Sequence, residues 1–188
     1  LPEQQRKAYL EGSWDVFAGQ FFDIWSPKHI ITPFVPHDNI IVGGMDWGRA
    51  KPFSFHLATV EKIFWQNEDS ELEPFYRVKT FFEIYGTQKN PQDWSQIIKD
   101  KLYKYGLKLS DISWIQCDPT IFNKGNDNSI SIRDQFFQDD ERWRILQPAK
   151  NERVAGWTYM FRWLANAPDG EPFYQSTSNC VNLNRTIP

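Results

Sequence analysis

Strand-like blocks of apolar residues fill the first half of the chain, before any helical pattern begins. Residues 39–46 form a short run that is rich in β-branched side chains and bounded by glycine, which predicts a strand buried on both faces. Two more runs, at 53–64 and 76–85, predict further strands, with an acidic connector at 65–74 between them. The three runs together predict an antiparallel meander.

Helical patterns alternate with short strands in the second half. Asn90-Pro91 is a typical helix start, apolar residues then recur at helical spacing, and Gly106 is a stop signal, so a helix is predicted up to Tyr105. Beyond it the pattern predicts a strand at 112–118, a helix at 130–137, a strand at 143–146 and a helix that begins near Asn151. This order is that of the RNase H-like fold, an α/β fold in which helices cover both faces of a mixed central sheet of five or more strands.

Length and composition favour one domain. The chain has 188 residues, of which 40% are hydrophobic and 16% aromatic, and this is enough for one substantial core. Residues 1–36, which include Pro27, Pro33 and Pro36, are expected to form an irregular lead-in, with the core starting at about residue 37. The sequence lacks a phosphate-binding loop of the GxxxxGK[ST] type, which excludes an ATPase of that class.

Charge and cysteine content narrow the function further. The formal net charge of −3 argues against a protein that coats nucleic acid, so any DNA contact should be local. Cys117 and Cys180 are the two cysteines, and their spacing is not that of a zinc site or a disulfide framework. No apolar run approaches the roughly 20 residues needed to span a bilayer, so we expect a soluble, intracellular protein.

Two aspartates are the main candidates for chemistry. Asp46 ends the first predicted strand, and Asp118 ends the fourth. These strands are adjacent and parallel in an RNase H-like sheet, so the two carboxylates would face one crevice and hold Mg²⁺ or Mn²⁺. Two such ions would support phosphodiester hydrolysis with water as the nucleophile. The alternative is that each aspartate only terminates its strand, because Asp is a common turn residue.

Short motifs are spread in order along essentially the whole chain. They are Leu-Glu-Gly-Ser-Trp-Asp at 10–15, Gly-Gln-Phe-Phe at 19–22, His-Ile-Ile at 29–31, Gly-Met-Asp-Trp-Gly at 44–48 with Pro-Phe at 52–53, Cys-Asp-Pro at 117–119, Pro-Ala-Lys-Asn-Glu-Arg-Val-Ala-Gly-Trp at 148–157, and Leu-Asn-Arg-Thr-Ile-Pro at 183–188. In order and spacing they resemble the nuclease domain of the large terminase subunit of tailed bacteriophages.

The resemblance implies a metal-dependent DNA endonuclease that cuts concatemeric viral DNA during genome packaging into the capsid, in the host cell cytoplasm. It implies as partners double-stranded DNA, the portal protein, the small terminase subunit and a terminase ATPase domain, which is absent from this chain, and it implies no membrane partner. Asp46 and Asp118 match two of the family's three metal-binding aspartates. The third would lie beyond Pro188.

Five other residues are secondary candidates. Glu83, on the third predicted strand, would approach the metal site or else lie on a solvated strand face. Arg49 and Lys51 follow the first strand directly, and Lys150 and Arg153 lie in a matched motif, so these four are candidates for contact with DNA phosphates. The alternative is that they are ordinary solvated charges of turns and helix starts.

Two other functions stay open. Because the third carboxylate is not in the sequence, the chain could instead be a docking module that grips DNA and the portal, with a weak or inactive nuclease site. It could also be another RNase H-like nuclease, such as a junction resolvase, which would share the two aspartates. Metal-dependent cutting tests the first alternative, and a preference for branched over linear DNA tests the second.

Overall fold

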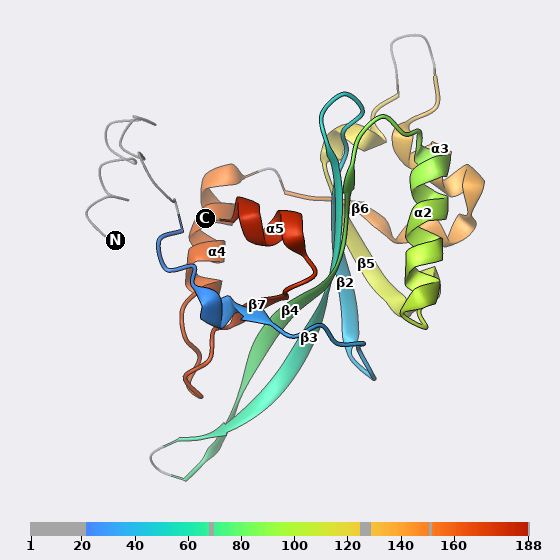
Figure 1. The fold of residues 1–188 in the computed structure, drawn as a ribbon. Helices are drawn as coiled ribbons and strands as arrows, with labels where there is room; N and C mark the ends of the chain where they lie inside the picture. The colour runs from blue at the N-terminus through green and yellow to red at the C-terminus, as the bar shows by residue number, and fades with distance from the viewer. Residues whose placement is uncertain (1–21, 68–69, 125–128, 151, 188) are drawn as a thin grey trace, which may run out of the picture.

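A computed structural model describes residues 22–67, 70–124, 129–150 and 152–187 of the chain (Figure 1). Residues 1–21, which carry most of the first two sequence motifs and the first part of the expected lead-in, lie outside the described residues. The same holds for Asn151, where the last helix was expected to begin, and for the side chain of Arg153.

One mixed sheet forms the centre of the molecule. Its seven described strands are β1 (Ile30–Ile31), β2 (Ile40–Asp46), β3 (Phe53–Gln66), β4 (Leu72–Gly86), β5 (Ile112–Cys117), β6 (Leu146–Pro148) and β7 (Tyr174–Thr177). They are arranged in the order β1-β7-β4-β3-β2-β5-β6. β3 runs antiparallel to β2 and β4, and the other neighbouring pairs are parallel. The expected meander of three strands is therefore confirmed.

Helices cover both faces of this sheet, as predicted. Figure 1 shows α2 (Pro91–Lys104) and α3 (Ile132–Asp139) on one side, and α4 (Arg153–Trp163) and α5 (Val181–Thr186) on the other. Short 3-10 turns join the elements: η2 (Pro27–His29), η3 (Leu109–Asp111), η4 (Pro119–Phe122) and η5 (Glu141–Ile145). Within the described residues, no helix combines the length and apolar character that crossing a membrane requires.

The longest helix begins and ends where its sequence signals indicate. The Asn90 side chain caps the start of α2 by accepting a hydrogen bond of 2.8 Å from the backbone N–H of Asp93, and Pro91 fills the first helical position. Gly106 follows the helix with a φ of +68°, a left-handed conformation that glycine adopts without strain. The helix buries Trp94, Ile98 and Leu102 in the main core.

The main core lies between the sheet and the layer of α2 and α3. Alternate residues of β3, namely Phe53, Phe55 and Leu57, are 0% exposed and point into this core. Trp143 of η5 is also fully buried, and its indole N–H donates a hydrogen bond of 2.7 Å to Ser95 Oγ on α2. The aromatic content of the sequence therefore serves mainly to pack this face of the sheet.

Three details differ from the sequence-based expectations. The strand expected at 143–146 is a 3-10 turn followed by β6, because the buried Trp143 needs a turn to reach α2. The lead-in contains a strand, since β1 pairs with β7. The acidic connector at 65–74 is short, because β3 and β4 stay paired from Phe53↔Gly86 to Gln66↔Leu72 and form a hairpin that projects beyond the other strands (Figure 1).

Candidate functional site

The two candidate aspartates lie at the same edge of the sheet. β2 and β5 are parallel neighbours, and their last paired residues are Met45 and Cys117. Asp46 and Asp118 follow these two residues directly, and the backbone N–H of Asp118 donates a hydrogen bond of 3.2 Å to the carbonyl oxygen of Met45. The prediction that the strands carrying Asp46 and Asp118 are adjacent and parallel is confirmed.

The electrostatics of the pair favour a bound cation. Partial burial raises the pKa of the Asp46 carboxyl, and the negative charge of Asp118 raises it further. Asp118 Oδ1 accepts a hydrogen bond of 2.8 Å from the backbone N–H of Thr120, which fixes the orientation of that carboxylate. Two carboxylates that repel each other at a fixed spacing supply hard oxygen ligands and excess negative charge, which are what a divalent cation requires.

Tight turns follow both aspartates. A Cβ on Gly48 would collide with the carbonyl oxygens of Lys51 and Pro52, so only glycine fits where the loop after β2 folds back on itself. Pro119 starts η4 directly after Asp118 and turns the chain away from the strand axis. Both turns leave the carboxylates at the rim of the sheet, beside no continuing strand.

The sheet face that carries Asp46 is open over its central strands. In the register of the sheet, Gly44 pairs with His56, and Asp46 pairs with Ser54, so these side chains share one face. A Cβ built on Gly44 would meet no atom of the described residues within 4 Å. Ser54, His56 and Ala58 are each only half-buried. A substrate could therefore lie across β2 and β3 next to the aspartates.

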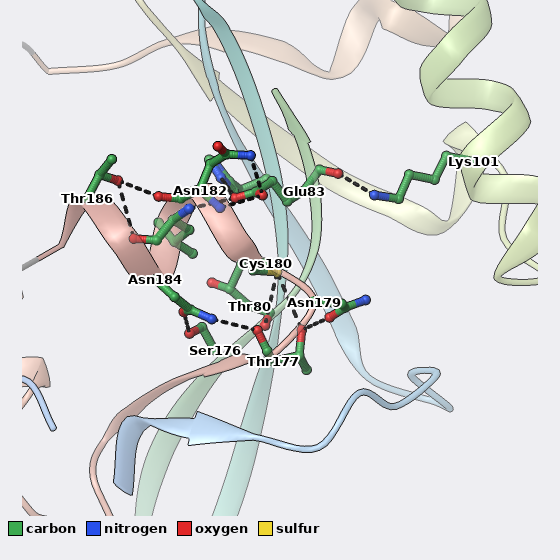
Figure 2. A network of polar contacts seen from close by, with 12 residues as sticks. Thr80, Glu83, Lys101, Ser176, Thr177, Asn179, Cys180, Asn182, Asn184 and Thr186 are labelled. Carbon is green, nitrogen blue, oxygen red and sulfur yellow. Dashed lines mark hydrogen bonds and ion pairs between the residues drawn. The ribbon is translucent and has the colours of Figure 1, made fainter. Parts of the chain in front are cut away.

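Glu83 lies on the same face, and its carboxylate is engaged by α5. It accepts hydrogen bonds from the backbone N–H groups of Asn182 (2.9 Å) and Leu183 (2.7 Å) and from the Asn182 side chain (3.1 Å). His56 Nε2 lies 3.4 Å from Glu83 Oε1, the oxygen that also accepts from Leu183. Burial alone would raise the pKa of Glu83, but these hydrogen bonds lower it below its usual value. The observed contacts make Glu83 one of the residues that hold α5 on the sheet, beside Ser176 and Thr177 of β7, which bond Asn184 (Figure 2). A part for Glu83 in chemistry stays a prediction.

His56 is a residue of this face to which the sequence assigned no role. Burial lowers its pKa, while the neighbouring Glu83 partly offsets this effect. Its spacing to other histidines carries no signal, and only the β3–β4 register, in which His56 pairs with Glu83, brings the two side chains together. Sequence reasoning alone could not reveal this contact.

The four basic candidates lie at three places. Arg49 and Lys51 are exposed in the loop after Asp46. Lys150 is exposed just after β6, where the backbone N–H of Ala149 donates to Cys117 O at 2.8 Å and so keeps this segment beside the Asp118 strand. Arg153 begins α4. Three of the four are therefore positioned at the rim on which the aspartates lie.

The described residues hold no group of three or more His, Cys, Asp or Glu side chains that could bind a metal ion. The donor set present is the pair Asp46 and Asp118, and its chemistry fits Mg²⁺ or Mn²⁺, because both cations prefer carboxylate oxygens and complete their coordination with water. These two residues would form the protein's share of such a site.

Comparison with known proteins gives the class of fold. No protein-family profile and no curated protein sequence matches the chain. Among solved structures, the nuclease domain of P22 large terminase matches 90% of this chain with a TM-score of 0.58 and 11% identity, and the match covers 78% of that domain. The large terminase of a thermophilic bacteriophage, solved in complex with ADP, matches 87% of this chain with a TM-score of 0.58 and 14% identity.

At such identities the likeness establishes the fold. The chain has the RNase H-like fold of a terminase nuclease domain, with the mixed sheet and two helical layers expected from its sequence. It spans about a third of the large terminase from the thermophilic bacteriophage, 35% of that chain.

Proposed function

We propose that this chain is a terminase-type nuclease domain, a metal-dependent endonuclease that cuts concatemeric viral DNA during genome packaging. The observation that carries the proposal is the placement of Asp46 and Asp118 at the ends of adjacent parallel strands, on a sheet face that the described residues leave open. Strand ends of this kind are where α/β sheets place their ligands. The likeness to large terminase structures supports the packaging role that the sequence resemblance implies.

Residues of the chain would hold and orient the metal ion that hydrolysis requires. Asp46 and Asp118 would hold Mg²⁺ or Mn²⁺ through their carboxylate oxygens, and the hydrogen bond from the Thr120 N–H would keep Asp118 in position. A divalent ion bound there supplies Lewis acidity, which activates water and stabilises the leaving oxygen. Water attacks phosphorus, one P–O bond breaks, and the leaving oxygen takes up a proton, so the products are a phosphate monoester and an alcohol.

The proposed partners follow from the same role. DNA would contact Arg49, Lys51, Lys150 and Arg153 through its phosphates, because such contacts position a duplex without reading its sequence. We propose that the nuclease works beside a terminase ATPase domain, the portal protein and the small terminase subunit in the host cell cytoplasm. These partners would keep cutting confined to the start and the end of packaging.

The test is cleavage of supercoiled plasmid by the chain in Mn²⁺, Mg²⁺ or EDTA. We expect nicking in the presence of the metals, none in EDTA, and a loss of at least about a hundredfold in Asp46→Asn and Asp118→Asn, because each variant removes a charged ligand. Asp38→Asn is the matched control, since Asp38 is exposed and lies just before the opposite end of β2. Cutting that persists in EDTA or in both site variants would contradict the proposal, and preferential cutting of branched DNA would indicate a junction resolvase.

One observation favours docking as a second function. The projecting part of the β3–β4 hairpin exposes large apolar side chains on one face, with Phe64 60%, Leu72 69% and Tyr76 51% exposed. Exposed apolar patches of this kind often mark protein contacts. A parent chain that fails to cut with any metal but binds portal protein would support a docking module with an inactive nuclease site.

A further inference from the structure

Two loops far apart in the sequence meet at the edge of the sheet that carries Asp46. β3 is antiparallel to both β2 and β4, so the end of β2 and the end of β4 lie at the same edge, on either side of the start of β3. The backbone N–H of Gln88 donates a hydrogen bond of 3.0 Å to the carbonyl oxygen of Arg49. Loops 47–52 and 86–90 therefore form one continuous rim, which starts beside Asp46.

This rim is basic in a chain that is acidic overall. Loops 47–52 and 86–90 contain Arg49, Lys51 and Lys89 and no acidic residue, although the chain has a formal net charge of −3. All three side chains are exposed. Local positive charge next to a carboxylate pair attracts polyanions to that place without causing them to bind non-specifically over the whole protein.

The rim leads from Asp46 to a cleft of about 500 Å³ on the far side of β4. Its walls come from β4 and the turn after it, from α2, and from the start of α5. The cationic lining residues are Lys89, whose Nζ lies 6.0 Å from the centre of the Trp94 ring, and Lys101 on α2. Glu83 is the one carboxylate among the described lining residues, and its oxygens already accept hydrogen bonds from α5. The cleft therefore presents positive charge.

Lys101 of α2 and Tyr105, which directly follows α2, close the free edge of β4 against another strand. β7 pairs with β4 only over Val78–Thr80, which leaves the backbone beyond Thr80 unpaired on that side. Lys101 Nζ donates a hydrogen bond to Glu83 O, and Figure 2 shows the Lys101 side chain extending from α2 to the sheet. Tyr105 OH donates to Phe81 O at 3.5 Å. An added peptide strand would have to break both contacts, which disfavours an extended peptide in this cleft.

The cleft also offers donors suited to a phosphodiester. Lys101 uses one of its three N–H donors on Glu83 O, so two remain for an anion. Burial lowers the pKa of Lys101, and the nearby Cys180 and Glu83 raise it in part. A bound phosphate would add negative charge and favour the protonated ammonium group.

We propose that this basic rim and cleft bind the sugar-phosphate backbone of DNA, with Lys89 and Lys101 contacting a phosphate away from the bond held at Asp46 and Asp118. The inference rests on the proposed nuclease function and extends it by a second contact region. β4 lies two strands from β2, about 10 Å away, which corresponds to about three base steps along a duplex. A DNA backbone crossing this edge would then reach the carboxylate pair and the cleft together.

The experiment measures affinity for a short fluorescein-labelled DNA duplex by anisotropy, in EDTA and over a range of NaCl concentrations. We expect Lys89→Gln and Lys101→Gln each to weaken binding by about threefold to tenfold and to reduce the salt slope by about one, as for a lost phosphate contact. The matched control is Lys104→Gln, which removes the same charge from the last turn of the same helix but does not line the cleft. It should bind like the parent.

Parent-like affinity and salt slope in both cleft variants would overturn the proposal, and so would an equal loss in Lys104→Gln, which would indicate a general charge effect. Thermal unfolding checks that each variant is folded. Should Lys101→Gln fail to fold, Lys101→Arg, expected to bind like the parent, and the exposed Lys89→Gln decide the matter. Because binding in EDTA needs neither metal nor cutting, this test can fail while the Asp46→Asn cleavage test succeeds, and the reverse.

Discussion

Neighbouring residues of β3 belong to two different environments, one on each face of the sheet. Phe53, Phe55 and Leu57 are fully buried against the layer of α2 and α3, whereas Ser54 and His56 between them are half-buried on the face of Asp46. β2 repeats the contrast, since its residues alternate between the core and the open face. One strand therefore contributes to stability with one set of side chains and to the candidate site with the other.

The contrast shows why the candidate site can be open without loosening the fold. On the core face, Phe53 stacks on Trp94 with ring centroids 4.5 Å apart, and Phe136 packs against Trp143 at 5.0 Å. On the other face, Gly44 and small side chains leave space beside the carboxylates. Tight packing on one side holds the strand ends, and with them Asp46, in a fixed position.

The largest effect should come from the core face. Phe55→Ala removes a ring that is 0% exposed and that packs against Phe82 and Trp143, so we expect a loss of about 3 to 5 kcal/mol in the free energy of unfolding. Ser54→Ala, one residue away on the open face, should change it by no more than about 0.5 kcal/mol. Urea denaturation measures both, and similar losses in the two variants would show that the faces do not differ as described.

A smaller loss of stability is expected at Glu83, where α5 begins to cover the sheet face that carries Asp46. Glu83→Gln removes the charge that accepts the backbone N–H groups of Asn182 and Leu183, and we expect a loss of about 2 kcal/mol, confined largely to α5. Hydrogen exchange of these two amides is the measurement. The hydrogen bonds lower the folded-state pKa of Glu83, so this stability is present above the unfolded-state value of about 4.3 and is lost as the pH falls through the folded-state value.

The Gln variant supplies the control for that pH dependence. As the pH falls below the unfolded-state pKa of Glu83 and through its folded-state pKa, the Asn182 and Leu183 amides of the parent should lose protection. Their exchange should then rise by more than the intrinsic rate changes, whereas the variant should show no such rise. Protection that stays equal in both proteins at every pH would show that the Glu83 carboxylate does not hold α5.

The sequence pattern was sufficient to predict an element where apolar periodicity and the burial of the element agree. The runs at 39–46, 53–64 and 91–105 are confirmed as β2, β3 and α2, because each combines apolar periodicity with a clear start or stop signal. From these elements the neighbouring positions of the Asp46 and Asp118 strands could be predicted.

Other features could not be predicted because they arise only from packing between distant segments. β7 consists of Tyr-Gln-Ser-Thr, and its Gln175, Ser176 and Thr177 are buried although they are polar, so hydropathy gives no sign of a strand. The basic rim needs loops 47–52 and 86–90 side by side, and the β3–β4 register alone brings them together. The role of Glu83 depends on a helix about a hundred residues further along the chain, as the separation of 100 between Glu83 and Leu183 shows.

The smallest effect should appear at Asp46 itself, as a gain in stability. Its folded-state pKa is raised by burial and by Asp118, so the stability linked to its proton is present below the unfolded-state value of about 3.9 and is lost as the pH rises through the folded-state value. At neutral pH without metal, Asp46→Asn should therefore melt slightly above the parent, and the difference should vanish in acid. Asp38→Asn should show no such gain.

Adding Mn²⁺ should stabilise the parent more than Asp46→Asn, because a cation relieves the repulsion between the carboxylates. Equal stabilisation of both proteins by Mn²⁺ would show that the ion binds away from the open face. The assignment of the core to one face of the sheet and of the candidate site to the other would then be wrong.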